Sequence, residues 1–144
     1  STPMRPTRSC EIYVDGASRG NPGPSGIGAV LLPADGKAGA APTRLSKYIG
    51  ETTNNVAEYL ALVYALQEAL REGYTDVAVK TDSELLARQM NGEYRVRYGQ
   101  LKLFHDLAAD LIRGFRGFRI QHIPRAQNTL ADRLAGQAVA SHSL

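Results

Sequence analysis

Strand-like and helix-like segments follow a particular order along this chain of 144 residues. Five short alternating or apolar runs bounded by turn residues read as strands, at residues 10–16, 27–33, 44–50, 76–82 and 118–124. Helical periodicity covers residues 53–72, 83–92, 100–114 and 126–140. Three strands come first on short connections, and later strands alternate with helices. This order predicts an α/β fold with a five-stranded mixed sheet, in which strands 1–3 are antiparallel, strands 1, 4 and 5 are parallel, and helices cover both faces.

Length and composition favour one compact domain. Hydrophobic residues make up 43% of the chain and charged residues 22%, which is ordinary for a globular protein. We expect this domain to span residues 10–140, between a flexible N-terminal tail at 1–9 and a short C-terminal tail at 141–144. No run approaches the roughly 18 apolar residues of a membrane span, so no membrane partner is expected.

The chain carries one cysteine, Cys10, which cannot form an internal disulfide and begins an apolar run. Residues 1–9 contain no apolar stretch of the kind found in a secretory signal. Both observations favour a cytoplasmic protein. The net charge of +3 and the isoelectric point near 9.2 favour a polyanionic partner, although many basic proteins bind none.

Glu58 interrupts the pattern of the first predicted helix. Thr53 is a candidate N-cap, and the apolar stripe that follows runs through Tyr59 and Leu62. Glu58 falls at the edge of this stripe, where an inward-pointing carboxylate loses much of its hydration. A simple alternative is that Glu58 favours the positive end of the helix dipole.

Three aspartates occupy comparable positions. Asp15 and Asp82 each stand at the exit of a predicted strand, and Asp132 points toward the small, apolar side of the last helix. Ligand sites in open sheets gather outside the carboxyl ends of parallel strands, so these residues and Glu58 can meet at one end of the sheet.

Four carboxylates in one place repel one another unless cations neutralise them. Oxygen-only ligands suit Mg²⁺ or Mn²⁺. Two such ions about 3.5–4 Å apart form the clamp of phosphodiester hydrolysis, in which one activates water and the other stabilises the leaving oxygen. The carboxylates therefore predict a site for two ions with substrate bound.

The same residues lie in motifs that resemble the type 1 ribonuclease H family over about residues 10–140. The matching segments are YVDGASRGNPGPSG, TTNNVAEY, KTDSE and NTLADRLA, in the order of the family. The resemblance implies a ribonuclease H-like fold and an endonuclease that cuts the RNA strand of an RNA–DNA hybrid, leaving 5′-phosphate and 3′-hydroxyl ends.

By motif position, the resemblance implies metal-binding and catalytic roles for Asp15, Glu58, Asp82 and Asp132. It also implies contacts with substrate. RNA 2′-hydroxyls would be contacted by Gly16, Asn21, Asn54 and Asn55. Glu84 would lie near the minor groove. Thr53 would hold a phosphate of the DNA strand. Amides and backbone groups suit a 2′-hydroxyl. The simpler reading of Asn54 and Asn55 is helix capping.

The chain departs from many family members in two places. It lacks the glycine-histidine loop before the last helix, and either Arg125 or His122 takes that place; we favour Arg125, which lies in the loop after Pro124. Arginine is no general base at neutral pH, so Arg125 would bind phosphate or ease product release. The long basic helix of some members is also missing, which leaves Arg95, Arg97 and Lys102 as a smaller phosphate-binding edge or a solvated loop.

Two other functions remain open from the sequence. A catalytically silent module that binds hybrid is disfavoured by the intact set of four carboxylates. A DNA nuclease of the same fold, such as an integrase or resolvase, is disfavoured by the TTNN and GNPG segments. Family members also occur fused to other enzymes, so the chain can be one domain of a longer protein. No strong signal for oligomers is present, and a monomer is expected.

Overall fold

The computed structural model describes residues 5–34, 41–97 and 99–142. Its strands are β1 (Ser9–Ser18), β2 (Gly23–Pro33), β3 (Thr43–Thr52), β4 (Asp76–Thr81) and β5 (Gly117–His122). Its helices are α1 (Asn54–Arg71), α2 (Glu84–Met90), α3 (Gln100–Ile112), the 3₁₀ turn η1 (Arg125–Gln127) and α4 (Thr129–His142). Every strand and helix expected from the sequence is present, with boundaries that differ by a few residues.

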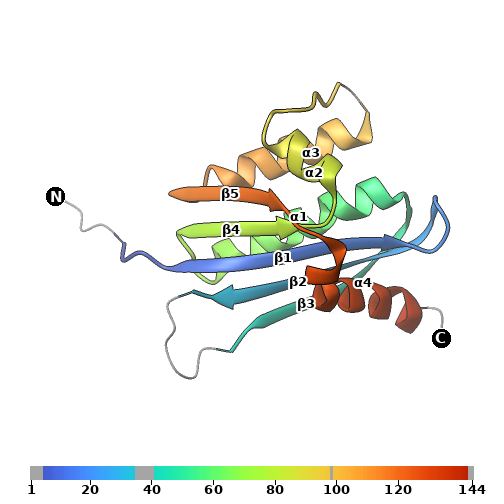
Figure 1. The fold of residues 1–144 in the computed structure, drawn as a ribbon, viewed down its shortest axis with the longest axis horizontal. Helices are drawn as coiled ribbons and strands as arrows, with labels where there is room; N and C mark the ends of the chain where they lie inside the picture. Colours follow the sequence, from blue (N-terminus) through green and yellow to red (C-terminus); the bar gives the residue numbers. More distant parts are fainter. Residues whose placement is uncertain (1–4, 35–40, 98, 143–144) are drawn as a thin grey trace.

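The five strands form one mixed sheet in the order β3-β2-β1-β4-β5 (Figure 1). Strand β2 pairs antiparallel with both β1 and β3, whereas β1, β4 and β5 run parallel. The predicted fold class is therefore confirmed. Because β1 and β4 are parallel neighbours, their carboxyl ends lie side by side at one end of the sheet, where ligand sites are expected.

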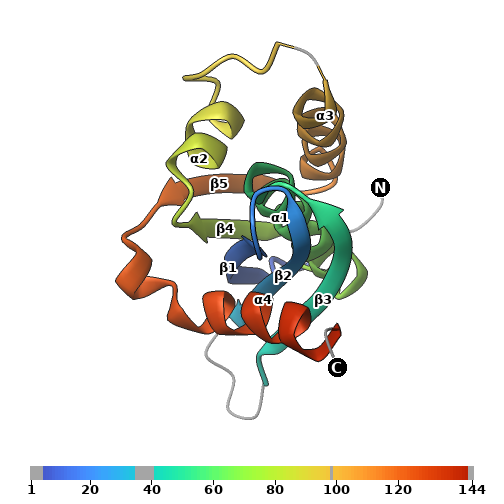
Figure 2. The ribbon, with the colours of Figure 1, turned by 90° about the vertical axis from the view of Figure 1, so that its right-hand side faces the viewer.

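Helices cover the sheet on two sides, as Figure 2 shows: α4 lies on one face, and α1, with α3 packed on it, lies on the other. The core is built between α1 and the sheet. Ile12 and Val14 of β1 point into it from alternate positions, and Leu62 and Leu66 of α1 meet them, all four fully buried. Alternation along β1 thus fixes which face of the strand carries apolar residues.

Glycines in β2 let α4 lie close to the sheet. A Cβ atom at Gly28 would stand 2.2 Å from the carbonyl oxygen of Ala131, and one at Gly26 would stand 2.7 Å from that of Ala135. No side chain fits in this space. The pair of glycines therefore sets how near α4 comes to β1 and β2.

The domain extends slightly past its expected boundaries. Arg8 and Ser9, assigned from the sequence to a flexible tail, belong to the folded structure: Ser9 opens β1, and the backbone N–H of Arg8 donates to Thr75 Oγ1 at 2.8 Å. At the other end, α4 continues to His142. The remainder of the two predicted tails, residues 1–4 and 143–144, lies outside the described residues.

Candidate active site

Two of the four carboxylates come from adjacent strand ends. The register pairs Val14 of β1 with Thr81 of β4, so the next residues, Asp15 and Asp82, lie side by side where the two parallel strands end. Asp15 is 4% exposed and Asp82 is partly buried. This is the position predicted from the strand exits.

Glu58 reaches the same place from α1. The helix begins as predicted, because Thr53 is its N-cap and accepts a hydrogen bond from the backbone N–H of Val56. Gly16, next to Asp15, lies directly against the helix: a Cβ atom there would be 2.4 Å from the backbone nitrogen of Glu58. Carboxylate oxygens of Asp15, Glu58 and Asp82 consequently all lie within 4.8 Å of one another.

Asp132 is brought to the site by the start of α4. The side-chain amide of Asn128, only 1% exposed, donates to the carbonyl oxygen of Val14 at 2.9 Å. The backbone N–H of Asp132 in turn donates to the carbonyl oxygen of Asn128 at 3.1 Å. Asp132 lies outside the tight group of three carboxylates, and it lines the same cavity of about 410 Å³ with all of them.

Burial and repulsion from neighbouring carboxyls favour the protonated forms of Asp15 and Glu58 in the protein without metal. Loss of hydration raises the pKa of Asp15 to about 8, and the neighbouring carboxyl of Asp132 and the charge of Asp82 add to this shift. Loss of hydration also raises the pKa of Glu58, with the charge of Asp15 as the next cause. The described residues therefore place too little positive charge beside Asp15 and Glu58 to offset their burial.

The site offers carboxylate oxygens as ligands, and few hydrogen bonds or ion pairs balance their charge. Glu58 Oε2 is buried and has no hydrogen-bond partner among the described residues. The described part of the chain supplies one ion pair to the four carboxylates, between Arg125 and Asp132 at 3.8 Å. An orphaned buried carboxylate oxygen beside two further carboxylates fits a hard divalent cation, which such oxygens prefer.

The predicted substrate residues at the loop after β1 are hydrogen-bonded to the start of α1. Asn54 Oδ1 accepts from the backbone N–H of Ser18 at 3.0 Å, and Asn21 Oδ1 accepts from the backbone N–H of Asn54 at 3.0 Å. Both asparagines are nevertheless exposed, as is Asn55. The capping explanation and the substrate explanation are thus compatible, because an amide oxygen can hold the loop while the remaining groups face solvent.

Thr53 is the N-cap of α1, and Glu84 is the first residue of α2. Glu84 is exposed in the first turn of α2, two residues after Asp82, and its carboxylate pairs with Arg88 at 3.1 Å. Ser83 caps this helix by accepting from Leu86. A short helix directly after β4 therefore holds Glu84 near the cavity, although Glu84 does not line it.

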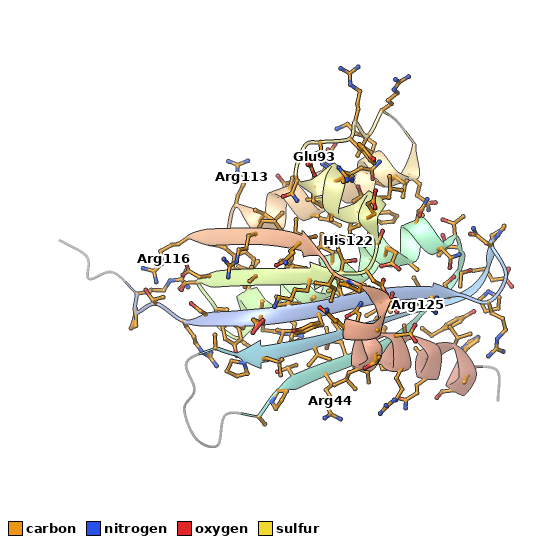
Figure 3. All side chains as sticks on the ribbon, viewed as in Figure 1. Arg44, Glu93, Arg113, Arg116, His122 and Arg125 are labelled. Carbon is orange, nitrogen blue, oxygen red and sulfur yellow. The ribbon has the colours of Figure 1, made fainter. Side chains whose placement is uncertain are left out.

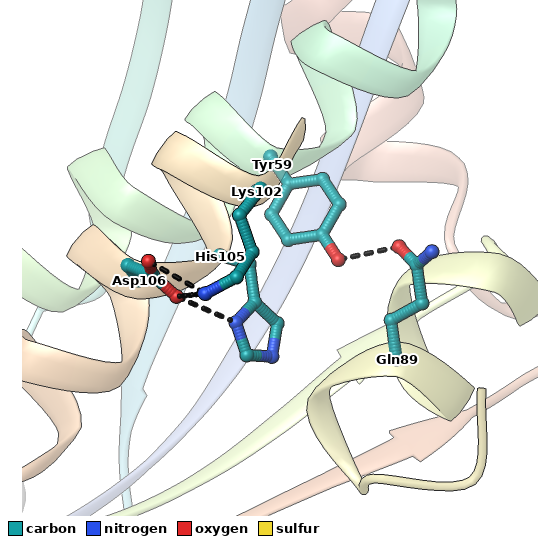
Figure 4. Close-up of polar contacts among 5 residues, drawn as sticks. All are labelled: Tyr59, Gln89, Lys102, His105 and Asp106. Atoms are coloured by element: carbon teal, nitrogen blue, oxygen red, sulfur yellow. Dashed lines mark hydrogen bonds and ion pairs between the residues drawn. The ribbon is translucent and has the colours of Figure 1, made fainter. Parts of the chain in front are cut away.

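A buried hydrogen bond fixes α2 against α1, as Figure 4 shows. The hydroxyl of Tyr59, the residue after Glu58, donates to Gln89 Oε1 at 2.5 Å. The ring of His105 on α3 meets the ring of Tyr59 edge-on, with centroids 6.5 Å apart. Packing from α2 and α3 thus holds the segment of α1 that carries Glu58.

The two candidates for the missing glycine-histidine loop occupy different places (Figure 3). Arg125 opens the 3₁₀ turn η1 and lines the carboxylate cavity with an 82% exposed side chain. His122 ends β5, is exposed, and lines a separate small hollow with Glu84, Arg88 and Glu93. Of these two residues, Arg125 is the one that lines the carboxylate cavity.

Some contributors carry only a weak sequence signal. The sequence places Asn128 in the last predicted helix, four residues before Asp132, and its contact with β1 joins residues 114 apart. Gly26 and Gly28 alternate within a strand, which is a known mark of close backbone approach. Arg95 and Arg97, considered as phosphate-binding residues, are exposed in the loop after α2, and no described contact brings them to the cavity.

A mixed sheet of this topology, with a carboxylate cluster at the ends of its central parallel strands, defines the ribonuclease H-like class of folds. Comparison with known proteins agrees. A family model described as reverse transcriptase-like matches residues 13–138. Ribonuclease HI of Halobacterium salinarum is 42% identical over 94% of this chain and 68% of its own length.

Solved structures give the same result. The crystal structure of RNase H1 from Halobacterium salinarum has a TM-score of 0.84 at 40% identity, covering 92% of this chain and 98% of that one. LC11-RNase H1 in complex with an RNA/DNA hybrid has a TM-score of 0.84 at 39% identity, covering 94% and 99%. The chain belongs to the type 1 ribonuclease H family.

Some relatives are much longer than this chain. It is 44% identical to the bifunctional protein Rv2228c of Mycobacterium tuberculosis over 89% of its own length and 35% of that protein. The chain therefore spans about a third of the mycobacterial relatives that it matches. No helix in the described ranges is long and apolar enough to cross a membrane.

Proposed function

We propose that this ribonuclease H domain hydrolyses the RNA strand of RNA–DNA hybrids, leaving 5′-phosphate and 3′-hydroxyl ends. The observation that carries the proposal is the group of three carboxylates whose oxygens lie within 4.8 Å, at strand ends in the ribonuclease H fold. The hybrid bound in the LC11-RNase H1 structure supports the choice of substrate.

Asp15, Glu58, Asp82 and Asp132 would hold two divalent cations, Mg²⁺ or Mn²⁺. When bound, the cations would supply activation of the attacking water and stabilisation of the leaving oxygen. The protein positions these ligands on rigid elements: two strand ends, the second turn of α1 and the first turn of α4. The buried, unpartnered Glu58 Oε2 supports this role, because only a cation or a proton offsets its lost hydration.

The loop after β1 and the start of α1 would read the RNA strand. Gly16, Asn21, Asn54 and Asn55 present backbone groups and amides, which can donate to and accept from a 2′-hydroxyl. The hydrogen bonds that join Asn21, Asn54 and Ser18 hold this surface before substrate arrives. Thr53 would face a phosphate of the DNA strand, and Glu84 would lie near the minor groove.

Arg125 would bind substrate and would not serve as a general acid or base. Its guanidinium lies 3.8 Å from Asp132 and is mostly exposed, so it can move toward a phosphate of the hybrid. A guanidinium stays charged at all ordinary pH values. We assign Arg125 to phosphate binding or to the release of product.

Further parts of the proposal concern the protein as a whole. The catalytic domain would be residues 10–140 with the small extensions described above, and the protein would be a cytoplasmic monomer. A single buried cysteine supports a reducing compartment. A longer protein that contains this domain would keep the same site.

The test is cleavage of a hybrid labelled on the RNA strand, with duplex RNA and duplex DNA of the same sequence as controls. Cleavage of the hybrid alone, with 5′-phosphate and 3′-hydroxyl products, is expected. Hydrolysis of duplex DNA in place of hybrid would establish a DNA nuclease. Binding of hybrid without cleavage in either metal would establish a silent binding module.

A further inference from the structure

A second, larger groove lies near the other end of α1. It measures about 770 Å³, against about 410 Å³ for the carboxylate cavity. Its apolar lining includes Leu45 of β3, Tyr64 and Leu70 of α1, and Leu111 of α3. Glu58 and Arg71 stand thirteen residues apart on α1, which is about 20 Å along the helix axis. The groove is therefore separate from the catalytic cluster.

Cations surround this apolar floor. Arg44, Lys47 and Arg71 line the groove, and all three are exposed. Arg71 pairs with Glu68, whereas Arg44 and Lys47 have no carboxylate partner in the described part of the chain. Lys47 Nζ stands 5.2 Å from the ring centroid of Tyr64, which keeps this ammonium above the groove. The described lining of the groove thus carries three cations and one carboxylate, that of Glu68, which pairs with Arg71, so the charge around the apolar residues is net positive.

The groove also runs along an open sheet edge. Strand β3 is the last strand of the sheet on this side, so one row of its backbone N–H and C=O groups pairs with no other described strand. Figure 3 shows Arg44 beside β3, and Arg44 lines this groove whereas Arg125 lines the carboxylate cavity. An edge strand can accept an extended peptide as an additional strand. Its basic side chains repel a second basic edge and attract an acidic segment.

We propose that this groove binds an extended acidic peptide segment of a partner protein, with an apolar side chain seated on the floor formed by Leu45, Tyr64 and Leu70. Arg44 and Lys47 would meet the acidic side chains, and the edge of β3 would bond the peptide backbone. A nucleic-acid backbone would use the cations alone. The apolar floor and the open edge together favour a peptide, and the proposal does not depend on nuclease activity.

The experiment measures fluorescence anisotropy of a labelled short peptide in which aspartates flank a single phenylalanine. We expect saturable binding that weakens at least tenfold when asparagines replace the aspartates, and also when glycine replaces the phenylalanine. Lys47→Glu and Arg44→Glu should each weaken binding of the aspartate peptide at least tenfold. Hybrid cleavage by both variants should equal that of the unmodified protein.

Arg119→Glu is the matched control, because Arg119 is exposed on β5, the opposite edge strand, and the substitution changes the net charge equally. It should leave peptide affinity unchanged. The proposal is overturned if the acidic peptide does not bind, if Arg119→Glu weakens binding as much as Lys47→Glu, or if an RNA–DNA hybrid displaces the peptide. The last result would assign the cations to nucleic acid.

Discussion

The side-chain amide of Asn128 donates a hydrogen bond of 2.9 Å to the carbonyl oxygen of Val14. Val14 directly precedes Asp15, and Asn128 lies four residues before Asp132. We expect Asn128→Ala to lower the free energy of unfolding by about 1 kcal/mol, because it removes this buried hydrogen bond. Chemical denaturation measures this change. Hybrid cleavage should fall as well, since α4 and Asp132 lose their anchor on β1.

Gln127→Ala is the control for that prediction. Gln127 is the preceding residue and is exposed. Its replacement should leave both the unfolding midpoint and cleavage nearly unchanged. If Asn128→Ala and Gln127→Ala unfold at the same denaturant concentration, the bond to Val14 does not hold the two elements together.

Gly16→Ala should separate Asp15 from Glu58. The added Cβ would stand 2.3 Å from the carbonyl carbon of Ala57 and 2.4 Å from the backbone nitrogen of Glu58, so β1 and α1 must move apart. A misplacement near 1 Å costs about a hundredfold in rate, and we expect a loss of that order. Steady-state cleavage of hybrid measures it. Gly136→Ala is the control, because nothing lies within 4 Å of a Cβ there, and full activity in Gly16→Ala would contradict the prediction.

The metal-free protein should lose stability as pH rises from about 4 to about 8. Burial raises the pKa of Asp15 from 3.8 to about 8, so the folded state binds a proton more tightly than the unfolded state. This contribution is fully present below the unfolded pKa and is lost as pH rises through the folded pKa. The raised pKa of Glu58 acts in the same direction. Thermal midpoints measured in EDTA across this range test the expectation.

Two controls accompany the pH series. Asp15→Asn should make the profile shallower, because the amide does not titrate and Glu58 remains. Saturating Mg²⁺ should restore stability above neutral pH, because the cation replaces the lost protons. A metal-free midpoint that rises between pH 5 and 8 would show that the cluster is compensated in some other way.

Arg125→Ala should lower turnover of hybrid several-fold and leave the thermal midpoint nearly unchanged. The Arg125 side chain is 82% exposed and touches the site through Asp132 at 3.8 Å, and exposed ion pairs contribute little to stability. His122→Ala should leave turnover unchanged. Steady-state kinetics on both variants decides between the two residues. A loss of activity in His122→Ala alone would transfer the assisting role to His122.

The sequence carries enough information to assemble most of the fold and the carboxylate set. Alternation in β1 marks its buried face, and the parallel order of β1 and β4 brings Asp15 and Asp82 together, because register and period are local properties. Glu58 is visible as a charge in an apolar stripe. The class of chemistry follows from these residues because oxygen ligands in such number require cations.

Long-range contacts are harder to read from the sequence. The bond from Asn128 to Val14 and the approach of Ala131 to Gly28 depend on how α4 crosses the sheet, and no local pattern records a crossing. The bonds that join Asn21 and Asn54 belong to a loop without periodicity. The start of α4 is also set by its surroundings. The apolar pattern alone predicts a start at Ala126, whereas the helix begins at Thr129, after a 3₁₀ turn.

The most direct test of the central claim is cleavage of an RNA–DNA hybrid by the unmodified protein and by Asp15→Asn, each in Mg²⁺, in Mn²⁺ and in EDTA. The unmodified protein should cut the RNA strand in either metal and fail in EDTA. Asp15→Asn should bind hybrid and cut at least a hundredfold more slowly, because one ligand of the cation site is lost. Wild-type cleavage by Asp15→Asn in Mg²⁺ would contradict the assignment of the carboxylate cluster as the catalytic centre.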